Sequence, residues 1–398
     1  MPQFPSEVFI YDAVRTPKAK VRRSGGTLAE VPSHDLLGQL LTALMERGLP
    51  PHVVDDVLIG TSTAVGEQGG DVARAALLWA GWPDEVPAGV VSRLCCSGLD
   101  AVESAAAKVA AGVADVVVAG GVESMSRIAM LSDKPAFAFD DELGERTGYV
   151  AIGVSADLTA VEYGFTRPDL DAAALRSHQR ALSAPPSKSI VPVSASADTV
   201  LAADEGARTD VTMASLAGLP PLSGSDADWD RVTRRLSGAT RPAVGMHTAG
   251  TAPQFADAAA AAVLGSPSAA VTLGCQPIAE IVGVAQAAVR SPLLTAPTVA
   301  AERALKNAGI TASALDVVEA NESFAASVLL MIKAFGLDPD KVNRWGGSMA
   351  TGHPLGASGG VLLVNALDQL VEGDGEFALV TIPAALGLGA AVVLRRLR

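Results

Sequence analysis

Two distant segments of this chain follow the same order of strand, helix, turn and helix, and this internal repeat constrains the fold more than any other feature. Residues 56–61 and 316–321 each read as a short buried strand that ends in a polar turn. A helical apolar run follows each strand, at 72–80 and 324–335, and a Pro-containing connection comes next. Two long copies are too few for a solenoid, so the repeat predicts a pseudo-twofold pair of layered α/β halves.

The connection in each copy leads to a second turn that opens another helix. The two turns, 92–98 and 349–356, place Cys95 and His353 at equivalent positions of the repeat. Each turn is followed by an expected helix and then an expected strand, at 99–111 with 114–119 in the first copy and at 357–371 with 377–382 in the second.

A third segment, residues 127–241, interrupts the repeat and is polar, Pro-rich and locally charged. We interpret it as an inserted loop domain. The N-terminal half then comprises residues 1–126 together with 242–276, and the C-terminal half comprises residues 277–398.

Composition supports an α/β protein with buried parallel strands, because hydrophobic residues make up 49% of the chain and aromatic residues only 4%. The uncharged run 377–394 is long enough to resemble a membrane span. Pro383, Gly387 and Gly389 within it favour two buried strands joined by a tight loop, so no membrane span is expected.

Several classes of function are disfavoured. A net charge of −13 repels nucleic-acid phosphates. The three cysteines provide neither a disulfide framework nor a metal-binding spacing, and no nucleotide-cofactor motif is present. The N-terminus carries no export signal, so we expect a reduced, cytoplasmic protein without a bound metal.

Three polar side chains at the repeat-related turns suit acyl transfer. Cys95 at a helix start gains from the helix dipole, which favours the nucleophilic thiolate. His353, just before a helix that Pro354 is expected to open, can accept the thiol proton. Asn321, at the end of a buried strand, can hold a water or a carbonyl oxygen in an oxyanion site. Taken singly, a core cysteine, a structural histidine and a turn-forming asparagine are equally ordinary interpretations.

At these residues the chain resembles the thiolase family, most closely the degradative type that forms the β subunit of fatty-acid-oxidation multienzymes. The resemblance runs through nearly the whole chain, and its landmarks are the motifs at residues 15–17, 69–74, 92–98, 119–126, 321–325 and 352–359.

The resemblance implies two βαβαβαββ thiolase half-folds with an inserted domain that holds coenzyme A and makes oligomer contacts. It implies acyl-CoA and CoA as substrates, no cofactor beyond CoA, a homodimer or homotetramer, and a hydratase-dehydrogenase subunit as a further partner. Cys95 would take the acyl group, His353 would activate Cys95, and Asn321 would position an oxyanion-hole water. Phe324 would lie along the pantetheine arm, with Ser323 beside it in the substrate site.

Two departures from the family pattern lie near the C-terminus. Pro383 stands where the family has a second, acid/base cysteine, and Ala385 replaces a glycine whose N–H completes the oxyanion hole. Cys275, in a different and strand-forming region, is a poor substitute. Since a general acid or base contributes about 10² to 10⁴ in rate, Pro383 is expected to impair the usual reaction.

The expected function is thiolytic cleavage of 3-oxoacyl-CoA, or the reverse Claisen condensation, through an acyl-Cys95 intermediate. Two alternatives stay open. One is a condensing enzyme that uses the Cys-His-Asn set alone, and the other is a catalytically inactive thiolase-like protein that binds acyl-CoA or serves as a partner subunit.

Overall fold

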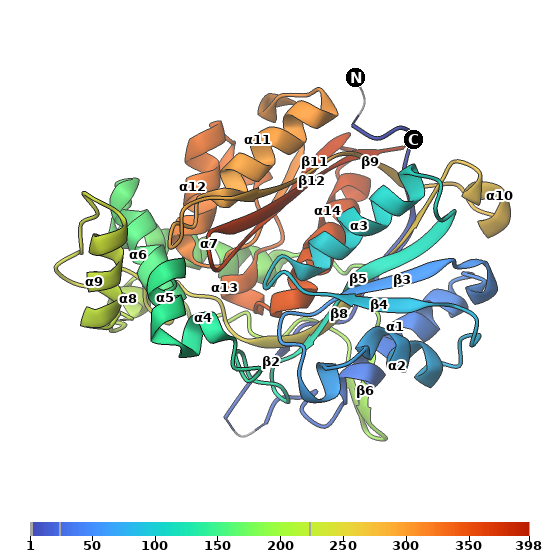
Figure 1. The fold of residues 1–398 in the computed structure, drawn as a ribbon, viewed down its shortest axis with the longest axis horizontal. Coiled ribbons are helices and arrows are strands. Elements are labelled where there is room, and N and C mark those ends of the chain that lie inside the picture. Colours follow the sequence, from blue (N-terminus) through green and yellow to red (C-terminus); the bar gives the residue numbers. More distant parts are fainter. Residues whose placement is uncertain (1–2, 24, 223, 398) are drawn as a thin grey trace.

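The computed structural model describes residues 3–23, 25–222 and 224–397, so the first two residues of the N-terminus, in which no export signal is expected, lie outside it. The repeat is confirmed as two halves of one α/β fold (Figure 1). The N-terminal half contains β1 (Phe9–Arg15), α1 (Ser33–Glu46), β3 (Asp56–Gly60), α2 (Val72–Trp79), β4 (Ala88–Val91), α3 (Ser97–Ala110), β5 (Val116–Ser124) and β8 (Ala256–Gly265).

The C-terminal half repeats this order, except that one strand is replaced by a single β-bridge. It contains β9 (Ala279–Ala288), α11 (Ala296–Ala308), β10 (Val317–Ala320), α12 (Ala325–Phe335), α14 (Ser358–Glu372), β11 (Phe377–Ala384) and β12 (Leu388–Arg396). The counterpart of β4 is a single parallel bridge between Val318 and Val342. The βαβαβαββ order expected for each half is therefore present.

One mixed sheet carries both halves, in the strand order β10-β11-β12-β9-β1-β8-β5-β3-β4. The short strand β2 (Ala19–Lys20) pairs with β8. The halves join where β1 pairs with β9, at Phe9 opposite Glu280 and Ile10 opposite Ala279. Because parallel β3 and β5 end at the same edge, the loops that follow them converge there.

The helices cover the sheet in layers. Since side chains alternate along a strand, Val117 and Ala119 of β5 face the core around α3 and α14, whereas Val116 and Val118 face α1 and α2. On the other half, Leu379 of β11 packs with α11 and α12. The helices α3 and α14, which follow the Cys95 and His353 turns, share the core between the halves.

The segment between β5 and β8 is richer in helix than the loop domain expected from its polar sequence. It contains α4 (Ala136–Phe139), α5 (Asp141–Thr147), α6 (Ile152–Glu162), α7 (Arg167–Ser183), β6 (Val193–Ser196), β7 (Thr199–Leu201), α8 (Met213–Ala217) and α9 (Asp226–Arg235). The short helices α10 (Ala269–Leu273) and α13 (Ser348–Thr351) and the 3-10 turns Pro51–Val53, Gly66–Gln68, Ala312–Ala314, Pro339–Lys341 and Leu355–Ala357 complete the elements.

The uncharged run 377–394 forms the antiparallel hairpin of β11 and β12, as predicted. Pro383 lies inside β11, opposite Gly389, rather than in the connecting loop. Among the described residues no helix is long and apolar enough to span a bilayer.

Glycines allow α3 and α14 to touch at their N-terminal ends. A Cβ at Gly98 would lie 2.6 Å from the carbonyl oxygen of Gly356, and one at Gly359 would lie 2.4 Å from the backbone nitrogen of Leu99. Neither distance is compatible with a methyl group, so the sequence of small residues sets how closely the two helix starts approach.

We expect Gly359→Ala to destabilise the protein by about 1 to 3 kcal/mol, because the new methyl group would push α14 away from the backbone of α3. Denaturant unfolding measures the change. Gly218→Ala is the matched control, since its φ is −76° and an added Cβ would meet nothing closer than 3.5 Å. Equal stability of both variants would show that the helices can separate without loss.

Candidate active site

A tight turn presents Cys95 just before α3. Leu94 adopts a left-handed φ of 51°, and the Ser97 hydroxyl donates to its carbonyl oxygen at 2.5 Å. The α-helix begins at Ser97, so Cys95 lies two residues before it and is half-buried. Cys96 is fully buried, with its thiol 3.5 Å from the carbonyl oxygen of Ile382 in β11. The turn therefore leaves one thiol half-buried and holds the other against the hairpin.

The expected lowering of the Cys95 pKa by the helix dipole is wrong. Burial, with the nearby Glu123 carboxylate as a second cause, raises the pKa of Cys95 to about 12. Desolvation and a like charge outweigh the attraction of a helix that begins two residues later. Cys95 is therefore a neutral thiol at neutral pH and needs a base to become a nucleophile.

His353 is held as a neutral base. Its backbone N–H donates to the Gln254 carbonyl oxygen at 2.7 Å, and its Nδ1 lies 2.6 Å from the Ser358 hydroxyl. Its Nε2 is buried and has no hydrogen-bond partner among the described residues. Burial, with Lys18 as a second cause, lowers the pKa of His353 to about 3. The sequence analysis placed the helix start at Pro354, but a 3-10 turn intervenes and α14 begins at Ser358.

The fold brings the two turns together. Cys95 and His353 each stand three residues before one of the glycines, Gly98 and Gly356, that meet between the helices. The buried Glu123 carboxylate ties the same region together by accepting from the backbone N–H groups of Gly356 at 2.8 Å and Ser62 at 2.7 Å. Glu123 was not predicted as a site residue, although a carboxylate at the end of the buried strand β5 marks it.

Asn321 directly follows β10, as expected, and two serines fix its amide. Its Nδ2 donates to the Ser323 hydroxyl at 2.7 Å, and its Oδ1 accepts from the Ser348 hydroxyl at 2.8 Å. Ser323, expected beside the substrate, thus contacts the catalytic candidate Asn321 directly. Ser348 had not been singled out, and only the tertiary contact identifies it.

Phe324 is buried at the start of α12, where its ring meets the edge of His247 with centroids 5.3 Å apart. His247 is held by Asp157 of α6, whose carboxylate lies 2.7 Å from Nδ1. Phe324 therefore lies where the inserted segment packs on the C-terminal half, and its contact with the pantetheine arm stays a prediction.

The residues with a left-handed backbone in the hairpin loop are not the ones expected. The left-handed conformations fall on Leu386 and Gly387, with φ of 61° and 72°, and not on Ala385. Ala385 therefore carries no strain from a left-handed backbone. Cys275 is exposed in the loop between α10 and β9 and not in a strand, so the sequence-based placement of this residue is wrong.

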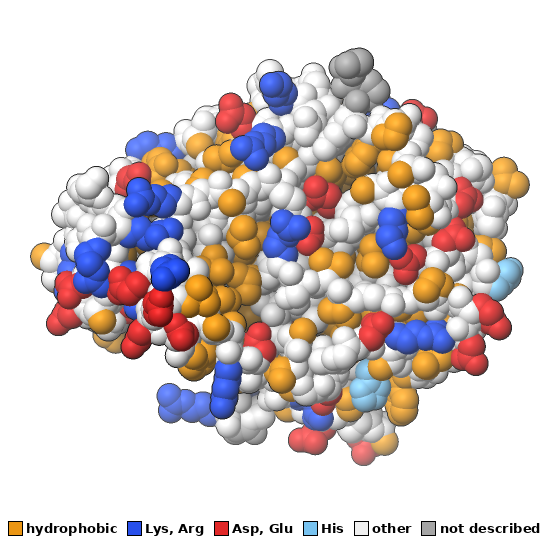
Figure 2. All heavy atoms as spheres, viewed as in Figure 1, with side chains coloured by type: hydrophobic (Ala, Val, Ile, Leu, Met, Phe, Trp, Pro, Cys, Tyr) orange, Lys and Arg blue, Asp and Glu red, His pale blue; other side chains and the backbone are white. Residues whose placement is uncertain are grey.

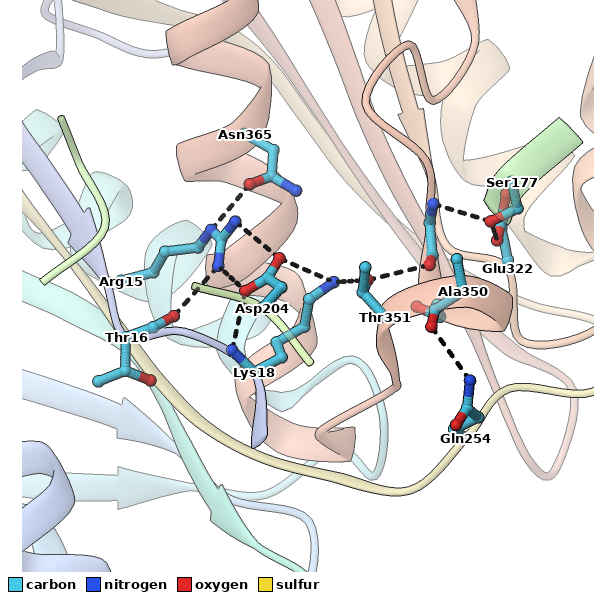
Figure 3. A network of polar contacts seen from close by, with 12 residues as sticks. Arg15, Thr16, Lys18, Ser177, Asp204, Gln254, Glu322, Ala350, Thr351 and Asn365 are labelled. Atoms are coloured by element: carbon cyan, nitrogen blue, oxygen red, sulfur yellow. Dashed lines mark hydrogen bonds and ion pairs between the residues drawn. The ribbon is translucent and has the colours of Figure 1, made fainter. Parts of the chain in front are cut away.

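A buried ion network lies behind the His353 turn (Figure 3). Asp204 accepts two hydrogen bonds from Arg15, at 2.7 and 3.0 Å, and one from the backbone of Lys18 at 2.8 Å. The Lys18 ammonium reaches across to the hydroxyl of Thr351, two residues before His353. Burial lowers the pKa of Lys18. Sequence reasoning treated residues 15–17 only as a landmark and missed this role.

The basic side chains that suit the phosphates of CoA lie in the inserted segment. Figure 2 shows Lys and Arg side chains gathered over the inserted helices at the left of the view. In α9, Arg231 and Arg234 both pair with Glu145, while Arg235 donates to carbonyl oxygens. Arg234 is more than half exposed, so its charge is open to a phosphate. Among the described residues no His, Cys, Asp and Glu side chains cluster in a way that could hold a metal ion.

Comparison with known families and structures identifies the family to which this fold belongs. Residues 8–226 match the thiolase N-terminal domain, and residues 275–396 match the thiolase C-terminal domain. The chain belongs to the thiolase family. Thiolases are acyl-CoA acyltransferases, and the match extends over both halves that carry Cys95 and His353.

Thiolases from several bacteria resemble it along their whole length. The β-ketoadipyl-CoA thiolase of Pseudomonas aeruginosa is 37% identical, over 98% of this chain and 99% of that one. The 3-ketoacyl-CoA thiolase of Saccharophagus degradans is 35% identical over the same shares. The crystal structure of Bacillus anthracis acetyl-CoA acetyltransferase superposes with a TM-score of 0.85 and 32% identity, over 98% of this chain and 99% of that one. The likeness to a fatty-acid-oxidation β subunit stays a prediction.

Proposed function

We propose that this thiolase cleaves 3-oxoacyl-CoA thiolytically through an acyl-Cys95 intermediate, with His353 as the base. The observation that carries the proposal is that the Cys95 and His353 turns meet at Gly98 and Gly356. The first turn holds a half-buried thiol, and the second holds a buried imidazole whose Nε2 has no protein partner among the described residues. Both groups are neutral in the resting protein, since the pKa of Cys95 is raised and that of His353 is lowered.

The first step moves one proton and breaks one carbon–carbon bond. His353 Nε2 takes the thiol proton while Cys95 Sγ attacks the 3-oxo carbon of the substrate. Asn321 and backbone N–H groups of the hairpin loop at Ala385 stabilise the oxyanion. The C2–C3 bond then breaks, the shortened acyl group stays on Cys95, and the acetyl-CoA carbanion takes a proton from protonated His353.

The second step regenerates the thiol. A CoA thiol gives its proton to His353 and attacks the acyl-Cys95 carbonyl, and the departing Cys95 thiolate recovers that proton. In this scheme His353 is the general acid and base in both steps, because Pro383 has no side-chain proton to exchange. We therefore expect cleavage to be slower than in a thiolase with two cysteines.

Exposed apolar side chains of the inserted segment support an acyl and pantetheine surface. Met130, Phe139 and Leu143 are between about a third and two thirds exposed, and Figure 2 shows hydrophobic side chains gathered between the inserted helices and the body of the molecule. Such a surface suits an acyl chain as well as pantetheine. The relatives' names point to two substrate types, 3-oxoadipyl-CoA and simple 3-oxoacyl-CoA, and a rate comparison across both types assigns the substrate.

A condensing enzyme that joins acyl groups is the second candidate, and Pro383 favours it. Condensation on a preformed Cys95 acyl group uses the Cys-His-Asn set without a second cysteine. Faster condensation than thiolysis at matched substrate concentrations would select it. A cytoplasmic location, a homodimer or homotetramer, CoA contacts from residues 127–241 and a hydratase-dehydrogenase partner are further parts of the proposal.

Incubation with acetoacetyl-CoA tests the function directly. We expect an acetyl adduct in the intact mass, located on Cys95 by peptide mapping, and release of acetyl-CoA when CoA is added. A protein that binds CoA yet forms no adduct and shows no turnover would instead be the inactive, acyl-CoA-binding thiolase.

A further inference from the structure

A carboxylate lies in the middle of an apolar strand, on the face that meets α14. Glu319 of β10 is fully buried between Val318 and Ala320. Its Oε1 accepts a hydrogen bond from the Gln369 amide of α14 at 2.7 Å. Its Oε2 is buried and has no hydrogen-bond partner among the described residues. A buried carboxylate oxygen left unpaired is costly, so a role for this one is expected.

A small cavity borders Glu319. The cavity has a volume of about 10 Å³, enough for one water, and is bordered by Lys18, Glu319, Asn321, Ser348, Ser358 and Asn365. These residues supply more than the two polar groups that a buried water needs. The cavity is thus bordered both by Glu319 and by Ser358, the first residue of α14.

The same first residue holds the catalytic imidazole. The Ser358 hydroxyl lies 2.6 Å from His353 Nδ1 and has one further hydrogen-bonding direction, since a hydroxyl both donates and accepts. Ser358 therefore separates His353 from the cavity.

We propose that Glu319 is a positioning residue for His353, acting through a water in this cavity and the Ser358 hydroxyl. The inference rests on the proposed role of His353 as the base for Cys95. Ionised Glu319 accepts from the water, the water accepts from Ser358, and Ser358 accepts from Nδ1–H. That direction places the proton on Nδ1 and leaves the Nε2 lone pair for the Cys95 thiol.

The arrangement extends the Cys95–His353 pair by a distant carboxylate, as the aspartate does in a Ser-His-Asp triad. A protonated Glu319 has a hydrogen to donate and no longer imposes the direction of the chain. His353 then spends time in the tautomer whose Nε2 carries hydrogen and cannot accept one.

The charges around Glu319 set the pH at which this control operates. Burial raises the pKa of Glu319 to about 7, against the Gln369 and Asn365 side-chain amides and the attraction of Lys18, all of which lower it. Glu322, after the same strand, adds repulsion, while α14 faces Glu319 with the uncharged amides of Asn365 and Gln369. Arg15 and Asp204 lie beyond Lys18 in the same ion network. Positioning is therefore lost as the pH falls below 7.

Alkylation of Cys95 by iodoacetamide tests the inference without any CoA substrate. We measure the rate at Cys95 by peptide mapping, in a Cys275→Ser background that removes the exposed thiol. Glu319→Gln copies the protonated carboxyl, so variant and parent should react alike at pH 5.5. At pH 8.5 the variant should react about tenfold more slowly, the lower end of the cost of losing a carboxylate that fixes the tautomer of a metal-binding histidine.

Two further variants keep the test sharp. In a Ser358→Ala background, Glu319→Gln should change the rate less than twofold at either pH, because the link is already broken. If Glu319→Gln does not fold, Ser358→Ala alone should remove the inflection near pH 7. Glu322→Gln is the matched control, since Glu322 is also buried but has Ser177, Asn343 and the Met349 N–H as partners. It should keep an inflection, moved to lower pH because the Glu322 charge no longer repels Glu319.

A rate ratio that is the same at pH 5.5 and 8.5 would mean that Glu319 only supports the fold, and would overturn the inference. An equal pH-dependent gap in Glu322→Gln would also overturn it, since any buried charge would then suffice. If acetoacetyl-CoA leaves no adduct while the Glu319 gap persists, the proposed function fails and the positioning role stands.

Discussion

Replacing Cys95 by serine is expected to lower acyl transfer by at least about 10³-fold and to abolish the acyl adduct. The substitution keeps the size of the side chain and the Leu94 turn, but a hydroxyl is far harder to deprotonate than a thiol. The Cys95 thiol is already a weak acid, with a pKa raised to about 12, and burial lowers the pKa of His353. His353 is therefore too weak a base to deprotonate a serine hydroxyl, which is a still weaker acid. Acetyl-CoA release from acetoacetyl-CoA and the intact mass measure the effect.

Cys275→Ser is the matched control, since Cys275 is exposed in the loop between α10 and β9. It should keep full activity and the full adduct. A Cys95→Ser protein that folds and still turns over at more than a tenth of the parent rate would remove Cys95 from the mechanism.

Replacing Pro383 by cysteine is expected to raise thiolysis by about 10² to 10⁴, the range of a general acid or base. Pro383 lies in β11 next to Ile382, whose carbonyl oxygen meets the Cys96 thiol at 3.5 Å, so the new thiol would stand beside the Cys95 turn. It would protonate the acetyl-CoA carbanion and deprotonate incoming CoA. Steady-state rates with acetoacetyl-CoA and CoA measure the gain.

Pro383→Ala separates the effect of the new thiol from the effect of removing the proline ring. We expect the alanine variant to stay within a few-fold of the parent. An equal gain in both variants would mean that the ring obstructs the site, and no gain in a folded Pro383→Cys protein that binds CoA would place the defect elsewhere.

Much of the fold was readable from the chain because it depends on local periodicity. The strands at 56–61 and 316–321, the helices after the two turns and the 377–394 hairpin follow from apolar spacing and from glycine and proline. The helices of the inserted segment were missed, since its polar, Pro-rich sequence hides the apolar side chains that pack between its own helices. Trp229 and Val232 of α9 are buried examples.

The site was only partly readable, for a physical reason. Sequence position placed Cys95 beside a helix start and thereby predicted a lowered pKa, whereas burial and Glu123 raise it. Desolvation depends on everything packed around the group, and no local pattern contains that information. The pairing of Ser348 with Asn321 and of Ser358 with His353 depends likewise on where the turns meet.

The sequence by itself determined the repeat, the two α/β halves and the residue types at the turns, because strand and helix periods are local properties. Only the tertiary structure decided that Cys95 and His353 are both neutral, that Asn321 is clamped by two serines and that the Glu319 carboxylate faces a cavity behind the site. Burial and the approach of distant segments set charge states and unpaired atoms, and these arise only when the halves pack together.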